Sequence, residues 1–398
     1  MKRFNCDAEM LDEFYIEQAI RNVCVNKKKN KKRSTRKYQK AQTILNNIEI
    51  YTKRIKTMLE YNNQKYLLES QNKEIPRIIE EKMFKPSKCK SFVINDGTNK
   101  KTRTITSVPI FPDQCIHELI IMMFKKTLLG KMYDHSYASI PGRGLHKCAK
   151  HVKKIIQHSQ NCSDIKYICK IDIKKCYPST SHSIIKKEID RKYKGYLMKK
   201  VIFDIIDSYH ESKDENNNNK VGIAIGYSIS QWIANLILTR VDIFIKHNLK
   251  IKNYVRYMDD MVMFGSNKRK IHKQLKLLRI FLKGLKYKIK KNWQIFKFDY
   301  INKKNKRIGR MIDFVGFKFY RDKTTLRRGL FLKLKRQAKK IFKYKLYYLS
   351  LCMSFISRIG WLKHCNSKKI YTKYIENYVD VRKIKGVISY EDRNNAIC

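Results

Sequence analysis

The stretch Asn253-Tyr-Val-Arg-Tyr-Met-Asp-Asp-Met-Val-Met-Phe-Gly265 places two adjacent carboxylates, Asp259 and Asp260, inside an otherwise apolar run. β-Branched and aromatic residues on both sides predict two short strands joined by a turn, with the aspartates at its tip. Bare negative charge beside apolar strands is costly to desolvate. We therefore expect a cation to bind at this tip.

A further carboxylate, Asp172, ends an apolar segment in Lys166-Tyr-Ile-Cys-Lys-Ile-Asp-Ile-Lys-Lys-Cys-Tyr-Pro-Ser179. If this strand lies beside the first pair, Asp172 and Asp259 face one point. Oxygen ligands without Cys or His favour Mg²⁺, with Mn²⁺ as the alternative, over zinc. Two such ions, about 3.5–4 Å apart, suit the attacking and leaving oxygens of phosphoryl transfer. The sequence thus predicts a two-ion site.

The order of the motifs gives these carboxylates a family resemblance. Tyr257-Met-Asp-Asp260 resembles the Tyr-x-Asp-Asp box of reverse transcriptases, and the segment from Asp172 to Tyr177 resembles their first catalytic box. Three further motifs occur in family order: Gly226-Tyr-Ser-Ile-Ser-Gln-Trp-Ile-Ala-Asn235, Lys290-Lys-Asn-Trp293 and Asp313-Phe-Val-Gly-Phe-Lys-Phe-Tyr320. The resemblance extends from about residue 15 to the C-terminal end.

This resemblance implies an α/β (α+β) right-hand polymerase with fingers, palm and helical thumb, which makes DNA from an RNA template. It implies that Asp172, Asp259 and the backbone carbonyl of Ile173 ligate the metals, and that Asp260 supports them. No RNase H carboxylate cluster, endonuclease motif or DNA-binding extension is visible in the sequence, so strand transfer or integration would need other factors.

Seven residues are candidates for contact with the incoming dNTP, three of which, Ile225, Gly226 and Gln231, belong to the motif described next. Arg103, on the second strand of a hairpin expected over 90–112, matches an Arg that holds the triphosphate in the family; a surface Arg is the alternative. Tyr177 matches the aromatic residue that excludes a ribose 2′-OH, with a core tyrosine as the alternative. Lys290 or Lys291 matches the region that supplies a cation, and a proton, to the pyrophosphate leaving group.

The segment Ile225-Gly-Tyr-Ser-Ile-Ser-Gln231 reproduces the pattern typical of enzymes from diversity-generating retroelements. Gly226 begins a Gly-x-x-x-Ser helix start, and Gln231 stands where most group II intron and retron enzymes carry Pro. Ile225 replaces a glutamine that, in retroviral enzymes, hydrogen-bonds near the nucleotide sugar. We hypothesise that the apolar residue relaxes fidelity; the alternative is that Ile225 packs a strand end.

The composition predicts a polyanionic partner. The chain has 89 Lys and Arg against 34 Asp and Glu, a formal charge of +55, and such a field attracts nucleic acid through counterion release. A codon bias explains abundant Lys but not scarce acids. The basic block 27–37, with Lys31, Lys32 and Arg33, could be a localisation tag, a disordered arm or a phosphate-binding segment. The resemblance favours contact with the RNA backbone, because reverse transcriptases of bacterial retroelements often carry a basic stretch here. The resemblance also implies contacts to template or nucleotide at the Gly-rich turn around Arg143, with a plain Gly-rich turn as the alternative, and to the primer at Gly316.

The chain is long enough for several subdomains. We predict a basic N-terminal helical region with an insertion over 1–82, fingers and palm over 83–320, and a basic helical thumb over 321–398. Expected helices run over 1–25, 41–60 and about 271–285, and the polar segment 61–82 has no readable role. Eleven Cys without CxxC spacing, no signal segment and no long apolar run predict a cytoplasmic protein, bacterial or phage-encoded, with no membrane partner.

Three hypotheses for function stay open at this point. The first is an error-prone retroelement enzyme that copies a template-repeat RNA, mutates at adenines and works with a small basic accessory protein. The second is a retron-like or defence-associated reverse transcriptase that acts with a dedicated, structured noncoding RNA. The third is an RNA-binding protein that no longer catalyses, which the three intact carboxylates disfavour.

Overall fold

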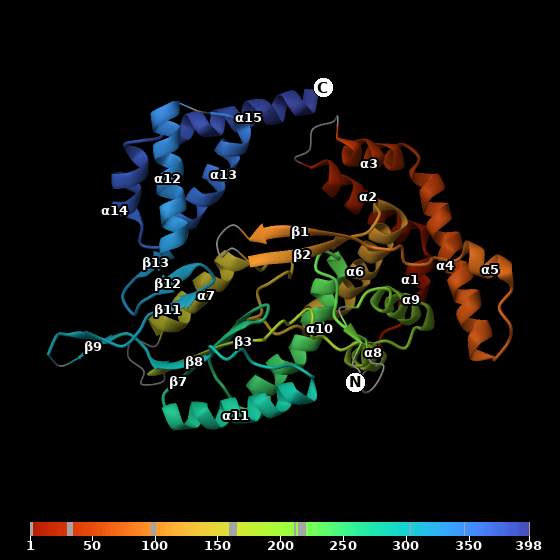
Figure 1. Cartoon of the computed structure of the whole chain (residues 1–398), viewed down its shortest axis with the longest axis horizontal. Helices are drawn as coiled ribbons and strands as arrows, with labels where there is room; N and C mark the ends of the chain where they lie inside the picture. The colour runs from red at the N-terminus through yellow and green to blue at the C-terminus, as the bar shows by residue number, and fades with distance from the viewer. Residues whose placement is uncertain are drawn as a thin grey trace. The chain divides into compact units, whose positions relative to one another are not determined.

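The chain forms two units whose segments alternate along the sequence (Figure 1). The computed structural model describes residues 3–29, 35–96, 101–158, 165–210, 212–213, 220–302, 304–345 and 347–397. The helical unit comprises Met1–Tyr133, Ile173–Phe244 and Leu278–Ile289. The sheet unit comprises Asp134–Asp172, Ile245–Leu277 and Lys290–Cys398.

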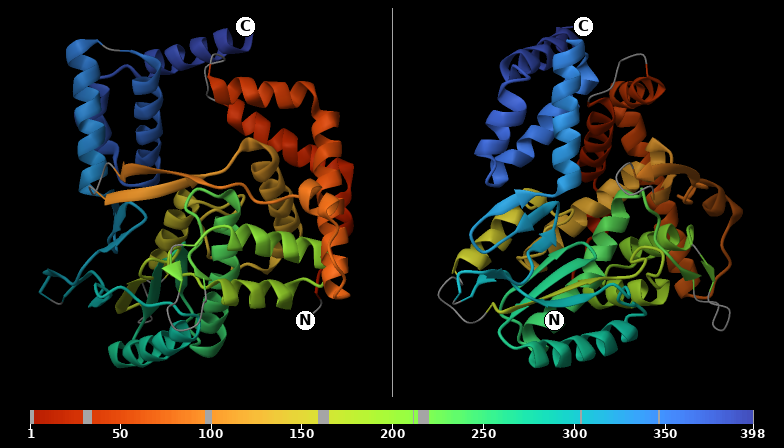
Figure 2. Two further views of the ribbon diagram at one scale, coloured as in Figure 1. Left: turned by 45° about the vertical axis from the view of Figure 1, so that its right-hand side comes forward. Right: turned by 60° about the vertical axis from the view of Figure 1, so that its left-hand side comes forward.

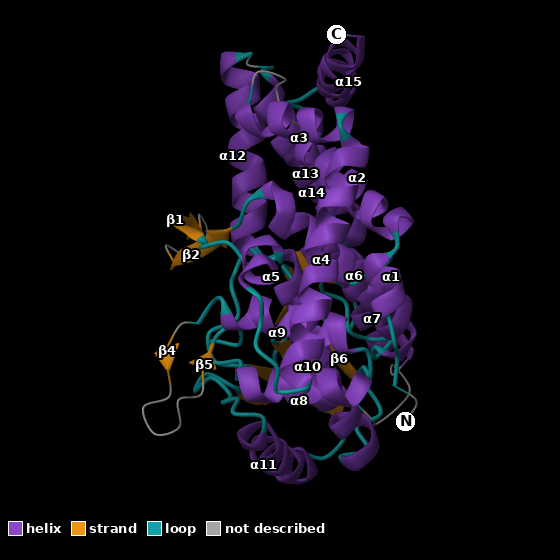
Figure 3. Cartoon of the chain, turned by 90° about the vertical axis from the view of Figure 1, so that its right-hand side faces the viewer, coloured by secondary structure: helices purple, strands orange, loops and turns teal. Residues whose placement is uncertain are grey.

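Helices make up most of the first 82 residues (Figure 3). The bounds here are α1 (Asp7–Leu11), α2 (Glu13–Lys28), α3 (Arg36–Asn46), α4 (Ile48–Ser70) and α5 (Arg77–Lys82). The single helix predicted over 1–25 is two helices, because the Asp12 carboxylate accepts a hydrogen bond from the Phe14 N–H (2.8 Å) and starts α2.

The predicted helix over 41–60 has wrong bounds, since α3 and α4 meet at Asn47 and α4 continues through the polar segment to Ser70. In this polar segment the inward-facing residues of α4, such as Asn62 and Tyr66, carry polar groups, so a hydrophobicity pattern does not show the helical period. The Asn62 side chain bonds the backbone of Phe84, and the Tyr66 hydroxyl donates to Asp204 (2.6 Å). The segment 61–82 is therefore packed structure.

The rest of the helical unit surrounds a buried helix, α10 (Ser228–Ile243), which packs against α6 and α8. It starts within the predicted Gly-x-x-x-Ser motif. The other elements are α6 (Cys115–Leu128), α8 (His182–Lys192), α9 (Tyr196–Asp207), β4 (Ser212–Lys213), β5 (Lys220–Val221) and the short turns η1 (Ile110–Gln114) and η2 (Leu129–Lys131).

The predicted hairpin over 90–112 is confirmed as β1 (Lys90–Asp96) and β2 (Lys101–Ser107), paired antiparallel. Its inner end is tied to the motif ahead of α10. The backbone N–H and the hydroxyl of Thr106 both donate to the Ile225 carbonyl, at 2.7 and 3.0 Å. The strand that bears Arg103 is thereby fixed beside Ile225.

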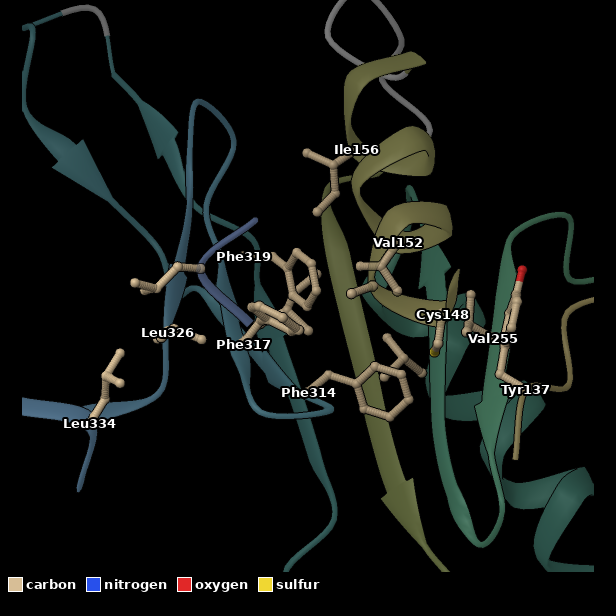
Figure 4. Packing of buried hydrophobic residues seen from close by; sticks show 14 of the residues in the cluster. Tyr137, Cys148, Val152, Ile156, Val255, Phe314, Phe317, Phe319, Leu326 and Leu334 are labelled. Atoms are coloured by element: carbon tan, nitrogen blue, oxygen red, sulfur yellow. The ribbon is translucent and has the colours of Figure 1, made fainter. Parts of the chain in front are cut away.

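A four-stranded antiparallel sheet in the order β6-β7-β3-β8 forms the centre of the sheet unit. Its strands are β3 (Tyr167–Asp172), β6 (Tyr254–Tyr257), β7 (Asp260–Gly265) and β8 (Gln294–Lys297). Helix α7 (Leu145–His158) covers one face with Cys148, Val152 and Ile156, which pack on apolar strand residues such as Val255 (Figure 4). Helix α11 (Lys268–Gly284), predicted over about 271–285, is confirmed, and the turn η3 (Phe244–Asn248) precedes β6.

The same apolar cluster continues into the C-terminal elements and includes Phe314, Phe317, Phe319, Leu326 and Leu334. In Figure 4, Phe314 lies toward Cys148, and Phe317 and Phe319 lie nearer Leu326. Burying each such side chain contributes roughly 1.5–3 kcal/mol. The elements are β11 (Ile312–Phe314), β12 (Phe317–Phe319), β13 (Thr324–Leu326), α12 (Arg328–Tyr344), α13 (Leu349–Ile359), η4 (Gly360–His364), α14 (Lys368–Tyr371), η5 (Thr372–Glu376) and α15 (Val381–Ile397). The helices expected from Arg321 onward begin only after β13.

No helix in the described ranges is both long and apolar enough to cross a membrane. The cysteines that the structure describes are free thiols. The division into regions 1–82, 83–320 and 321–398 stays a prediction about functional subdomains.

Candidate active site

The antiparallel pairing of β3 with β7 brings the predicted carboxylates together. Asp172, the last residue of β3, lies directly opposite Asp260, the first residue of β7. Asp259 occupies the turn between β6 and β7, next to Met258, whose φ is +55°. A left-handed conformation is uncommon for a methionine and marks a constrained turn. The predicted side-by-side strands are therefore confirmed.

Burial and mutual repulsion govern the ionisation of these groups. Burial, together with the negative charges of Asp172 and Asp260, raises the pKa of Asp259 to about 6. Burial and Asp172 also raise the pKa of Asp260, against the opposing positive charges of Lys170, Lys290 and Arg327. Three carboxylates at one sheet end thus leave negative charge that a bound cation would stabilise.

The oxygen atoms of Asp172 meet different surroundings. Oδ1 is buried and accepts no hydrogen bond from any residue that the structure describes, whereas Oδ2 contacts the Lys290 ammonium at 2.5 Å. An orphaned buried oxygen beside two more carboxylates fits a hard divalent ion. Within the described ranges, however, no three Asp, Glu, His or Cys side chains already converge on one ion position. A metal would therefore compete with Lys290.

Lys290 reaches this position through its backbone. Its N–H donates to the Asp172 carbonyl (2.8 Å), after Ile173 and Ile289 form a single antiparallel bridge. The lysine predicted to serve the leaving group therefore lies on the Asp172 carboxylate here. Lys291, the next residue, is exposed.

Two cationic residues were missed in the sequence. Lys170 lies two residues before Asp172, on the same face of β3, and its ammonium donates to the Asp313 carbonyl (2.7 Å). Arg327 forms an ion pair with the Asp313 carboxylate (2.5 Å). The alternation of a strand would have placed Lys170 on the carboxylate face, but no local signal identifies Arg327.

Arg256 is the third missed residue. Its side chain is fully buried, and Nη1 donates to the Met258 carbonyl (3.3 Å) in the turn that carries Asp259. Its backbone also pairs with the segment around Ser136. A charged residue within an apolar strand was the available signal, because a buried arginine needs partners. Arg256 is thus a positioning residue of the turn.

The nucleotide-binding candidates of the helical unit come together through backbone contacts. The Tyr177 carbonyl accepts from the Ile223 N–H (3.1 Å), and Ile225 holds Thr106 of the hairpin strand that also carries Arg103. Arg103 lies on an exposed part of that strand, and Gln231 is exposed in the first turn of α10.

Two features of the structure require glycine at position 226. Its φ is +123°, and a Cβ there would lie 2.1 Å from the Thr106 carbonyl oxygen. This contact decides how closely the hairpin approaches the motif.

The residues predicted to contact nucleic acid lie in different surroundings. Lys31, Lys32 and Arg33 fall outside the described residues. The Arg143 side chain is only 14% exposed and braces its own loop, through the Ser136 carbonyl (2.9 Å) and the Asp134 carboxylate (3.7 Å). Gly316 has a φ of +83°, and a Cβ would lie 2.5 Å from the Trp361 ring. Packing inside the protein therefore accounts for this glycine.

A model of the family described as reverse transcriptase (RNA-dependent DNA polymerase) matches residues 85–318, more than half of the chain. The chain belongs to the reverse transcriptase family. Membership of this family confirms the α/β right-hand polymerase fold class that was predicted from the sequence. Each motif quoted above lies within or at the end of the matched range.

Relatives of this reverse transcriptase are distant. It is 23% identical over 146 residues to the putative COX1/OXI3 intron 1 protein of Saccharomyces cerevisiae, an alignment of 35% of this chain and 16% of that protein. Among solved structures, Candida albicans telomerase with a TWJ fragment of telomeric RNA is 13% identical, with 79% of this chain and 58% of that chain covered and a TM-score of 0.42. Apo telomerase of Candida tropicalis is 12% identical, with 68% and 52% covered and a TM-score of 0.45.

The first prediction concerns Gly226. We expect Gly226→Ala to lower the free energy of unfolding by about 1–3 kcal/mol, because a Cβ both clashes with Thr106 and disfavours the positive φ. Urea unfolding monitored by circular dichroism measures this. Gly130→Ala is the matched control, since no atom lies within 4 Å of its added Cβ. Equal effects of the two variants would contradict the close approach.

The second prediction concerns the carboxylate repulsion. The folded pKa of Asp259 is raised to about 6 from 3.8, so the folded state binds the proton more tightly than the unfolded state. The contribution of Asp259 to the free energy of unfolding is therefore fully present below about pH 4 and is lost as the pH rises through about 6. Without divalent ions, Asp259→Asn should therefore unfold at higher urea than wild type at pH 7.5.

The advantage of Asp259→Asn over the wild type should shrink near pH 4. Asp190→Asn, at a half-exposed carboxylate, is the control. An Asp259→Asn variant less stable than wild type at pH 7.5 would show that repulsion does not dominate the site.

Proposed function

We propose that this reverse transcriptase makes cDNA on an RNA template by nucleotidyl transfer assisted by two Mg²⁺ ions, with Mn²⁺ as an alternative. The proposal depends on one observation: Asp172, Asp259 and Asp260 lie together at a sheet end, buried enough to raise the pKa of Asp259. Uncompensated carboxylates are an unfavourable arrangement unless a cation binds.

Asp172, through its orphaned Oδ1, Asp259 and the Ile173 carbonyl would hold the ions, and Asp260 would support them. When bound, the ions would stabilise negative charge on the attacking and leaving oxygens. The Lys290 ammonium lies on the Asp172 carboxylate at this site, which makes it the candidate general acid for the pyrophosphate leaving group, with Lys291 as the alternative.

For the nucleotide, we propose that Arg103 binds the triphosphate and that Tyr177 excludes the ribose 2′-OH, selecting dNTPs. The Ile225–Thr106 hydrogen bonds support this assignment, because they hold the Arg103 strand next to the Gly226 motif. Gln231 and Ile225 would border the nucleotide. Residues 83–320 would then serve as fingers and palm, and the basic helices after residue 320 as the thumb.

At a finer level, we propose that the enzyme belongs to a diversity-generating retroelement. The segment from Ile225 to Gln231 supports this assignment. Such an enzyme would work in the bacterial cytoplasm on a template-repeat RNA, with a small basic accessory protein. The defence alternative would use a dedicated noncoding RNA, and the RNA–DNA hybrid is a ligand in both. The formal charge of +55 suits these polyanions.

The third prediction tests catalysis. Purified protein should extend a DNA primer on an RNA template with dNTPs and Mg²⁺, and Asp259→Asn should reduce the rate about 10³-fold, because metal stabilisation of the transition state supplies several kcal/mol. Asp190→Asn is the charge-matched control.

Extension by wild type and Asp259→Asn at equal rates would refute the assigned carboxylates. Tight RNA binding without extension, on generic and cognate templates alike, would favour a non-catalytic RNA-binding protein.

The fourth prediction addresses fidelity. Sequenced products should show errors concentrated at template adenines, and Ile225→Gln should lower that error frequency about fivefold, because one added hydrogen bond contributes about 1 kcal/mol. The same substitution at Ile243, an exposed residue of α10, is the control. Errors spread evenly over template bases would favour the defence alternative. Adenine errors that Ile225→Gln leaves unchanged would refute the role of Ile225 in fidelity.

A further inference from the structure

A small basic hairpin leaves the sheet unit between β8 and β11, where β9 (Tyr300–Ile301) pairs with β10 (Arg307–Ile308). Figures 1 and 2 show β9 in a loop that projects from the neighbouring strands. Residues 300–310 contain five Lys and Arg and no Asp or Glu. Lys304, Lys306 and Arg310 are exposed. None of the sequence motifs covers this hairpin.

An ion-pair network around the buried carboxylate of Asp299 fixes the base of the hairpin. The Asp299 side chain, only 3% exposed, accepts from Arg307 through both Nε (2.5 Å) and Nη2 (2.6 Å), and from the backbone N–H of Arg321 (2.9 Å). Arg307 also contacts the Asp322 carboxylate at 2.5 Å. Two-pronged arginine–carboxylate contacts are strong and directional. The network therefore sets the direction of the hairpin.

Backbone contacts add a second constraint. The Asp299 N–H donates to the Arg310 carbonyl (3.1 Å), and the Arg310 N–H donates to the Lys297 carbonyl (3.0 Å). Gly309 has a φ of +90°, and a Cβ there would lie 2.6 Å from the Phe298 carbonyl oxygen. A hairpin with two residue pairs is marginal alone, so these contacts are what hold it outward.

The surface chemistry of the hairpin distinguishes between two kinds of partner. Ile301 is 65% exposed and Ile308 39% exposed, but Ile301 pairs with Arg307 and Ile308 with Tyr300. Cross-strand partners share a face and neighbouring residues alternate, so the isoleucines lie on opposite faces. They form no continuous apolar patch of the kind a protein partner needs. Lysines at the tip suit a polyanion instead.

We propose that the braced basic hairpin, described over residues 300–302 and 304–310, binds the phosphate backbone of the RNA strand in the template–primer. Arg307 is neutralised by its two carboxylates, so Lys304, Lys306 and Arg310 would supply the phosphate contacts. The choice of RNA as ligand rests on the proposed function. The hairpin would be a contact separate from the basic helices after residue 320.

The test compares Lys304→Gln/Lys306→Gln with Lys273→Gln/Lys276→Gln, which removes the same charge from exposed positions on α11. Fluorescence anisotropy measures binding to an RNA template annealed to a DNA primer over a range of KCl concentrations. Each lost phosphate contact should reduce the slope of log K against log[salt] by about 0.7–0.9. The hairpin variant should therefore lose about 1.5 in slope, and the α11 variant should keep it.

Equal slopes for the two variants would overturn the proposal, and would leave the hairpin as a surface for a protein partner. Primer extension at saturating template separates this result from failure of the proposed function. If the wild type extends primers and the hairpin variant keeps the wild-type slope, only the hairpin contact is refuted. If the wild type never extends primers but the slope difference remains, RNA binding by the hairpin stands and the proposed polymerase activity is refuted.

A second variant separates bracing from charge. Asp299→Asn removes a negative charge, so electrostatics alone predicts tighter RNA binding. Loss of the Arg307 contact predicts weaker binding, because the hairpin would no longer be held outward. Weaker binding by a variant that still extends primers at saturating template supports the proposal. Tighter binding overturns the role of the brace.

Discussion

Repulsion among three carboxylates is the constraint on which the rest of this reverse transcriptase depends. The register of β3 against β7 places Asp172 opposite Asp260, and the turn after β6 adds Asp259. Backbone hydrogen bonds of the sheet enforce this proximity, because a one-residue slip would move every side chain to the other face. Stability is thus given up locally for a site that attracts cations.

The surroundings of the site compensate for this repulsion with positive charge. Lys290 contacts Asp172 directly, Lys170 lies on the same face of β3, and Arg327 contributes from beyond β13. These three residues are far apart in sequence and converge only because the sheet and the C-terminal strands share one apolar core. The core that contains Phe314 and Phe317 therefore has an electrostatic consequence as well as a packing role.

Close backbone approach organises the helical unit in a different way. Gly226 allows the Thr106 carbonyl to come near, and the Ile225 carbonyl fixes the same residue through two hydrogen bonds. Position 226 requires glycine because the β1–β2 hairpin approaches it closely. Position 316 requires glycine because the Trp361 ring packs against it. Both reasons are steric and are set by parts of the chain distant in sequence.

The sequence by itself determined that the three aspartates lie together, the hairpin over 90–112 and the reverse transcriptase family, because these depend on short motifs in a fixed order. It failed over 61–82, where Asn62 and Tyr66 fill buried positions and hide the helical period. Only the tertiary structure placed Lys290 on Asp172, Arg256 beneath the Met258 turn and Asp299 at the base of the β9–β10 hairpin. Polar side chains carry no periodic signal, and their partners are decided by strand register and by chain crossings between distant segments.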